Sequence, residues 1–266
     1  MKRPQPATAR RSRFIRSGFA ALLAGTGLPP ALHAQAVTFS GAAALSSQLV
    51  DRGQAMTSRT PVLQGAADWT FPSGWSLGLS GSAELRSPGR LVAAIAQASR
   101  HWSLSGDWQM QANLLYYRYA GTARSRRFER AESGLSWSYR DVLTFGLSAI
   151  HVVGSRHRLR GAADISLHWP LTRQLSLSAG AGIAQSPIAP YNAYGYGYAD
   201  ACEYGPAGSC SRRRGTDRHR YGHLGLLWNH GPWRIELDRI LADPQTRWQW
   251  DVMGASPWVA TVTRSF

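Results

Sequence analysis

Hydrophobic and polar residues alternate along most of the chain after residue 36. The alternation is unbroken over Trp75–Arg86 and Leu159–Trp169, where one face is aliphatic or aromatic and the other carries Ser, Gly, His or charged residues. Period-two patterning predicts β-strands with two different faces. These runs last about ten residues, longer than strands of soluble proteins usually are. A strand of that length, tilted by about 45°, crosses the apolar layer of a bilayer.

Twelve segments carry this pattern, and the connections between them alternate in length. The short connections have two or three residues, whereas most of the connections on the other side are longer. An even number of strands with short turns on one side and longer loops on the other is typical of an outer-membrane barrel. The sequence therefore predicts an all-β fold, a transmembrane antiparallel up-and-down β-barrel of about 12 strands. The predicted strands are 37–49, 62–71, 74–86, 90–104, 107–119, 128–139, 142–153, 159–170, 174–185, 217–229, 232–242 and 257–266.

The two ends of the chain point to the same compartment. Residues 1–36 combine a basic, acid-free start with a short apolar stretch and a small-x-small sequence, which predicts a cleaved signal peptide. Cleavage follows Ala36 or, alternatively, Ala34. Residues 37–266 then form the barrel, and their last strand ends at Phe266, like the final strands of bacterial outer-membrane proteins. We therefore expect the mature chain in the bacterial outer membrane.

Composition narrows the class of protein and its partners. Charged residues make up only 17% of the chain, and its formal charge of +15 falls to +9 when the six basic residues of the signal peptide are removed. An exported chain without a basic helix or a zinc motif predicts no nucleic-acid partner. The expected partners are outer-membrane lipid, lipopolysaccharide and small hydrophilic solutes, and the oligomeric state is not readable from the sequence.

The first predicted hairpin contains Arg52-Gly53, Pro61 followed by Gln64-Gly65, and the turn Ser73-Gly74. In these motifs it resembles the TorF-type porin family of proteobacterial outer-membrane β-barrels. The match is strongest over residues 40–85, with an Arg-Gly pair ending the first strand, a Pro-x-x-Gln-Gly strand and a Ser-Gly turn. The sequence departs from the family at Gln48, Leu49 and Asp51. The resemblance implies a porin-like barrel and does not identify a solute. The matching residues are Arg52, Gly53, Pro61, Gln64, Gly65 and Gly74.

If the aliphatic face of each strand meets lipid, the other face lines the lumen. A lumen with charges of both signs among Ser and Gly suits either a wet channel or a barrel plugged by salt bridges. Twelve strands leave more space than an eight-strand barrel and less than a sixteen-strand porin. The charged residues predicted to line the lumen are Glu84, Arg86, Arg130, Glu132, Arg160, Asp164, Arg234 and Glu236.

The long external loop 186–216 offers a second candidate site. Cys202 and Cys210 are the only cysteines, and export to an oxidising compartment predicts that they form a disulfide. The basic run Arg212, Arg213 and Arg214 follows. It could constrict the mouth and favour anions, bind lipopolysaccharide phosphates, or belong to an exposed loop with solvated charge.

Three functions remain open at this stage. The first is an outer-membrane porin-like channel for passive diffusion of small hydrophilic solutes, with a weak anion preference. The second is a plugged structural or adhesive barrel. The third is an outer-membrane lipid hydrolase, for which His101 and Ser103 have a suitable spacing but lie beside a tight turn. His219 and His223 would be about 13 Å apart on one strand, too far to share a metal. We therefore expect a non-enzyme without a catalytic residue, metal site or cofactor.

Overall fold

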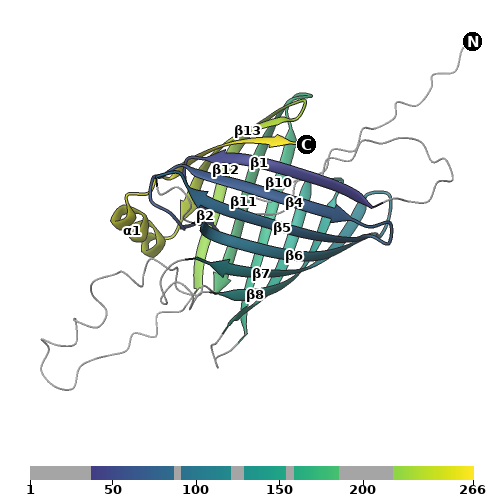
Figure 1. Ribbon diagram of the computed structural model, residues 1–266, viewed down its shortest axis with the longest axis horizontal. Helices are drawn as coiled ribbons and strands as arrows, with labels where there is room; N and C mark the ends of the chain where they lie inside the picture. The colour runs from purple at the N-terminus through teal and green to yellow at the C-terminus, as the bar shows by residue number, and fades with distance from the viewer. Residues whose placement is uncertain (1–36, 87–90, 121–128, 154–158, 186–217) are drawn as a thin grey trace, which may run out of the picture.

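The chain forms a closed barrel with one end covered by a short helix (Figure 1). The computed structural model describes residues 37–86, 91–120, 129–153, 159–185 and 218–266. The predicted signal peptide, the loop 186–216, the cysteine pair and Arg212–Arg214 lie outside the described residues and stay predictions. Among the described residues, no helix has the length and hydrophobicity needed to span a membrane.

Twelve strands build the barrel, as the alternation predicts. Each strand pairs antiparallel with its neighbours, and the first strand pairs with both the last and the second to close the ring. Every predicted segment matches an observed strand to within three residues at both ends. The strands are β1 (Thr38–Ser46), β4 (Val62–Thr70), β5 (Trp75–Glu84), β6 (Leu91–Ser103), β7 (Trp108–Tyr119), β8 (Arg130–Tyr139), β9 (Leu143–Val152), β10 (Arg160–Pro170), β11 (Leu175–Gln185), β12 (Arg218–His230), β13 (Trp233–Ala242) and β14 (Trp258–Ser265).

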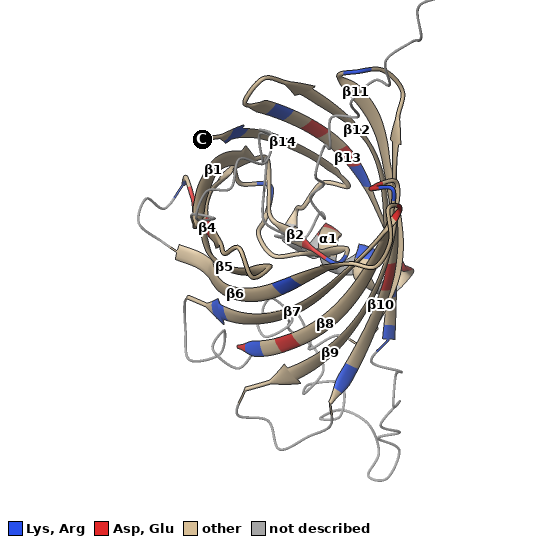
Figure 2. Ribbon diagram, turned by 90° about the vertical axis from the view of Figure 1, so that its right-hand side faces the viewer, with Lys and Arg blue, Asp and Glu red and all other residues tan. Residues whose placement is uncertain are grey.

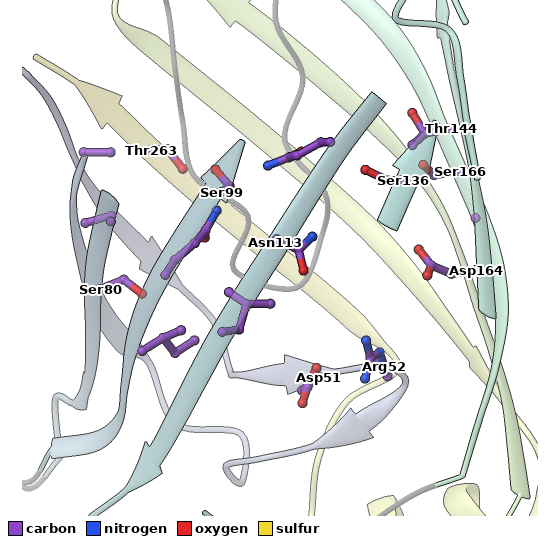
Figure 3. A pocket seen from close by; sticks show the side chains of 18 of the residues that line it. Asp51, Arg52, Ser80, Ser99, Asn113, Ser136, Thr144, Asp164, Ser166 and Thr263 are labelled. Carbon is purple, nitrogen blue, oxygen red and sulfur yellow. The ribbon is translucent and has the colours of Figure 1, made fainter. Parts of the chain in front are cut away.

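The outer face of the barrel is an apolar belt. Leu79, Leu114 and Leu147 lie in the middle of three different strands and are each 55–56% exposed. Their chain neighbours Ser80 and Asn113 point into the lumen (Figure 3). In water such a belt would be costly, at roughly 25 cal/mol per Å² of apolar surface. An apolar exterior around a polar interior is the arrangement of a transmembrane barrel of the outer-membrane type.

The barrel is closed by the end of the chain. The backbone N–H of Gly41 donates to the Phe266 carbonyl at 2.9 Å, and the N–H of Phe266 donates back at 3.0 Å. The Phe266 ring covers Gly41, where a Cβ atom would overlap it. Arg264 points outward with its guanidinium 5.5 Å from the centre of the Trp233 ring. From this position the Arg264 side chain can extend its charge toward the lipid headgroups.

The tight connections lie at one end of the barrel. Arg140 and Asp141 both adopt positive φ, at 47° and 58°, as a two-residue hairpin turn requires. Ser105 accepts hydrogen bonds from two backbone N–H groups of its own turn, and Thr172 does the same in another. Short turns mark the periplasmic end of such barrels, so the helix and the longer connections lie at the external end.

Three elements lie outside the predicted strands. Residues 50–61 and 243–256 connect predicted strands, and the first of these segments contains the strand pair β2 (Val50–Asp51) and β3 (Gln54–Ala55), while the second contains α1 (Pro244–Met253). Asp243 caps α1 by accepting from the Thr246 N–H at 2.9 Å. Burial alone would raise the pKa of Asp243, but hydrogen bonds from backbone N–H groups hold that pKa below its usual value.

Candidate functional site

A cavity of about 680 Å³ occupies the barrel. It begins at the periplasmic end, where Gly74 and Asp141 line it, and reaches the external end at Arg52. Small polar side chains from several strands line its wall, among them Ser80, Ser99, Asn113, Ser136, Thr144 and Ser166 (Figure 3). A water-filled space of this size and polarity can accept a small hydrophilic solute.

The external end of the cavity is narrowed by a hairpin folded into the barrel. We call residues 47–61, which contain β2 and β3, the inner hairpin. β2 lies within the ring of strands when the barrel is viewed near its axis (Figure 2). Arg52 and Gly53 turn the hairpin with positive φ of 46° and 74°. A side chain at residue 53 would be strained by that φ and would also overlap the Cβ atom of Tyr221.

Apolar contacts fix one side of the inner hairpin to the wall. Leu49 and Met56 are each only 5% exposed, although they lie inside a polar lumen. Burying two such side chains stabilises the docked hairpin by about 1.5–3 kcal/mol each. The hairpin and barrel residues in this cluster are Leu49, Met56, Val62, Ala93, Ile95, Tyr117 and Tyr119.

Two crossed ion pairs fix the other side of the hairpin to β8. Arg52 forms a bidentate salt bridge with Glu132, in which Nη1 donates to Oε2 at 3.1 Å and Nη2 donates to Oε1. Arg130 donates to Asp51 at 2.5 Å, and its guanidinium lies 4.1 Å from the centre of the Tyr117 ring. We call Asp51, Arg52, Arg130 and Glu132 the latch. It joins a hairpin and a strand about 80 residues apart in the chain.

The hairpin half of the latch is ionised at neutral pH. Burial alone would raise the pKa of the Asp51 carboxyl, but the guanidinium groups of Arg130 and Arg52 outweigh burial and hold it below its usual value. Burial would likewise lower the pKa of Arg52, but Glu132 and Asp51 raise it. Since the folded pKa of Asp51 is depressed, its pairing stabilises the docked state above the unfolded pKa of 3.8 and is lost only as the pH falls through the lower, folded value.

The connection between β13 and β14 covers the hairpin from outside. Trp250 of α1 donates from Nε1 to the Gly53 carbonyl at 2.9 Å. The Gln48 side chain is hydrogen bonded to the Ser256 backbone through both its oxygen and its nitrogen. His219 Nε2 lies 3.1 Å from the Arg52 carbonyl oxygen, to which it donates. The turn of the hairpin is therefore held by the wall, the helix and its connection together.

Lumenal side chains lie flat against the wall because their partners across the sheet are glycines. His223 is opposite Gly180, and a Cβ atom on Gly180 would overlap the imidazole ring. The same arrangement recurs on several strands, so glycine keeps polar groups on the wall and out of the centre of the cavity. The pairs are Asp68 with Gly78, Asn113 with Gly134, His223 with Gly180, Tyr221 with Gly182, and Asp238 with Gly225.

Adding a methyl group under these side chains should narrow the lumen. We expect Gly180→Ala to push the His223 ring inward and lower the single-channel conductance, at a cost to barrel stability of about 1–3 kcal/mol. Gly65→Ala is the matched control, because Gly65 faces outward and a Cβ atom there meets nothing within 4 Å. Equal conductance in the two variants would show that His223 does not border the conducting path.

The eight predicted lumen residues fall into three groups. Glu132, Asp164, Arg234 and Glu236 line the cavity, and Arg234 donates to Glu236 at 3.1 Å. Arg130 points inward at the external end, where it belongs to the latch. The other three lie at strand ends and are not among the residues that line the cavity: Glu84 and Arg160 are half-buried and Arg86 is exposed.

Sequence reasoning missed the hairpin half of the latch. Asp51 and Arg52 fall in the connection between the predicted strands 37–49 and 62–71, where Gly53 is a local signal of a turn. Ser103 is the candidate nucleophile of the hydrolase alternative. In the structure its hydroxyl donates to the Ser105 carbonyl at 3.2 Å.

Comparison with known proteins supports the fold. No protein-family model matches the chain, and no curated protein matches it. Among solved structures, the KdgM porin is 8% identical with a TM-score of 0.50, and the match covers 85% of this chain and 99% of that one. The NanC porin is 10% identical with a TM-score of 0.47, covering 86% and 99%. OprD from Pseudomonas aeruginosa is 12% identical with a TM-score of 0.33, covering 77% and 59%.

Proposed function

We propose that this protein is an outer-membrane channel through which small hydrophilic solutes diffuse passively. The observation that carries the proposal is the polar cavity of about 680 Å³ inside a barrel with an apolar exterior. Its wall of serine, threonine and asparagine offers hydrogen bonds to a passing solute in place of those it makes to water. The KdgM porin, whose fold is similar over almost its entire length, is a porin by name.

The resemblance to TorF-type porins is compatible with this proposal. Two of the residues that carry it, Arg52 and Gly53, form the turn of the inner hairpin. The hairpin narrows the path, and we propose that it sets the largest solute that can pass. We therefore propose membership of that family together with the channel function.

A plugged structural barrel is the second candidate, and the inner hairpin is the observation that favours it. The ion pairs of the latch and the contacts of Leu49 and Met56 hold the hairpin in the lumen. A lumen closed at its external end would conduct nothing. The two candidates therefore differ in one measurable property, the permeability of a membrane that contains the protein.

Liposome swelling separates the two candidates. Vesicles that contain the refolded protein are diluted into isotonic solutions of neutral sugars of increasing size. The channel predicts swelling with a pentose and progressively slower swelling with di- and trisaccharides. Swelling no faster than in protein-free vesicles, for a protein with β-rich circular dichroism, would favour the plugged barrel.

The sign of ion selectivity depends on which charges border the path. The sequence predicts a weak anion preference from the overall positive charge and from Arg212, Arg213 and Arg214. Those three residues lie outside the described residues, so their contribution remains a prediction. Neutralising all three should move the reversal potential toward cations if they stand at the mouth.

A further inference from the structure

The lumen and the outer surface of the barrel carry opposite charges. Among the described residues, seven carboxylates and two guanidinium groups line the cavity. Among the described residues, Arg239 and Arg264 instead face outward, and their guanidinium groups lie 5.6 Å and 5.5 Å from the centres of the Trp258 and Trp233 rings. The overall positive charge of the chain therefore does not describe the surface that a solute meets. The lining carboxylates are Asp51, Asp68, Glu132, Asp141, Asp164, Glu236 and Asp238.

Each arginine that reaches the lumen is already neutralised by a carboxylate. Arg52 pairs with Glu132, and Arg234 pairs with Glu236. Arg130, behind the hairpin, pairs with Asp51. A guanidinium in a salt bridge has little remaining attraction for a passing anion. Among the described residues that line the lumen, the arginines are therefore all engaged by carboxylates.

Two lumenal carboxylates have an oxygen that accepts no hydrogen bond from any described group. These are Oδ2 of Asp68 and Oδ1 of Asp238. The residues are only 4% and 6% exposed, so each is more than nine-tenths buried. Asp68 accepts a single long hydrogen bond from Thr70 at 3.3 Å. A buried carboxylate with so few donors costs free energy unless it takes up a proton or a cation or hydrogen-bond donor approaches it.

Glycine places both carboxylates along the wall. Asp68 lies across Gly78, where a Cβ atom would be 3.0 Å from Oδ2, and Asp238 lies across Gly225, where a Cβ atom would overlap Oδ1. Asp68 is close to the periplasmic end, and Asp238 is in the middle of β13. Asp51 and Glu132 at the hairpin are neutralised by arginines, so Asp68 and Asp238 place carboxylates without an arginine partner at two depths along the cavity. Negative charge repeated along a low-dielectric passage concentrates cations within it.

We propose that the lumen admits small cationic solutes, such as primary ammonium or guanidinium compounds, in preference to anions. Asp68 and Asp238 are the residues that determine this specificity, and hydroxyl groups of the wall accept the remaining hydrogen bonds of the cation. Carboxylates that line a pore favour cations by this mechanism. The proposal rests on the channel function and names the class of solute that the channel passes.

The test is the reversal potential of the reconstituted protein in a planar bilayer under a potassium chloride gradient. The wild type should pass potassium more readily than chloride. In the Asp68→Asn, Asp238→Asn double variant, the permeability ratio should fall by up to about tenfold for each carboxylate, because a unit charge acting through about 6 Å of water favours potassium about threefold and disfavours chloride about threefold. Asp107→Asn is the matched control, since Asp107 is exposed in a turn and pairs with Arg140.

The possible outcomes separate this proposal from the channel function. Current that favours chloride, or a permeability ratio that the double variant leaves unchanged, would overturn the cation preference and leave the channel function intact. If neutralising Arg212, Arg213 and Arg214 alone moved a chloride-selective wild type toward cations, the external loop would set the sign instead. Swelling assays with lysine and glutamate, which have opposite net charge, give the same comparison for organic solutes, with lysine expected to enter faster.

Discussion

Replacing Arg130 with alanine should release the inner hairpin and raise the single-channel conductance. The substitution leaves the carboxylate of Asp51 buried in the lumen without its partner, and removing one member of a buried pair costs about 3–5 kcal/mol. The barrel strands cannot move to relieve that cost, because their ladders close the ring. The hairpin can swing toward water, so a change of about 3 kcal/mol shifts its docking equilibrium by about two orders of magnitude.

Arg118→Ala is the matched control for the released hairpin. Arg118 also lies near the external end, but it is 69% exposed and its nearest approach to Glu129 is 3.8 Å. Exposed pairs contribute about 0–1 kcal/mol, so this variant should conduct like the wild type. If Arg130→Ala folds into a barrel and its conductance equals that of Arg118→Ala, the inner hairpin does not limit the flow.

The second large effect is expected when a charge is placed on the outer face of the barrel. Leu79 is 56% exposed in the middle of β5, and Leu79→Arg would place a charge against the centre of the lipid layer. We expect it to lower the free energy of unfolding by about 2–4 kcal/mol. The measurement is urea-induced unfolding in lipid vesicles, followed by tryptophan fluorescence.

Ser80, the chain neighbour of Leu79, supplies the control. Ser80→Arg changes the same strand but points into the lumen. It should leave the free energy of unfolding almost unchanged and lower the conductance by filling part of the cavity. An equal stability loss in both variants would mean that the outer face of β5 does not meet lipid.

The barrel could be predicted from the sequence because each strand encodes its own two faces. Leu77 and Leu79 alternate with Ser76, Gly78 and Ser80, and lipid and water select opposite members of that series. Neighbouring strands follow one another in sequence, so the topology needed no long-range information. The terminal strand was equally readable, because its alternation continues to Phe266.

The inner hairpin could not be predicted in this way. Leu49 and Met56 do not alternate with polar residues over a long enough run, and their partners Ile95 and Tyr117 lie on other strands. Asp51 and Arg130 are 79 positions apart in the chain, so a local sequence pattern cannot predict that they pair. The helix α1 did have a readable signal, since Asp243 and Pro244 form an N-terminal cap and Gly254 ends the helix.

The charge of the lumen cannot be predicted from the total charge for a related reason. The total charge sums both faces and both ends of the barrel, while a solute meets only one face. Of the predicted lumen residues, Arg160 begins β10 and Arg86 follows the end of β5, and neither is among the residues that line the cavity. Only the three-dimensional arrangement separates outward arginines from inward carboxylates such as Asp68.

Single-channel recording in planar lipid bilayers tests the central claim, a water-filled path through the barrel, most directly. The purified, folded wild-type protein should produce discrete conductance steps of uniform size, and Arg130→Ala should produce larger ones. A bilayer into which the folded protein demonstrably inserts, but which shows no conductance steps for either protein, would contradict the account.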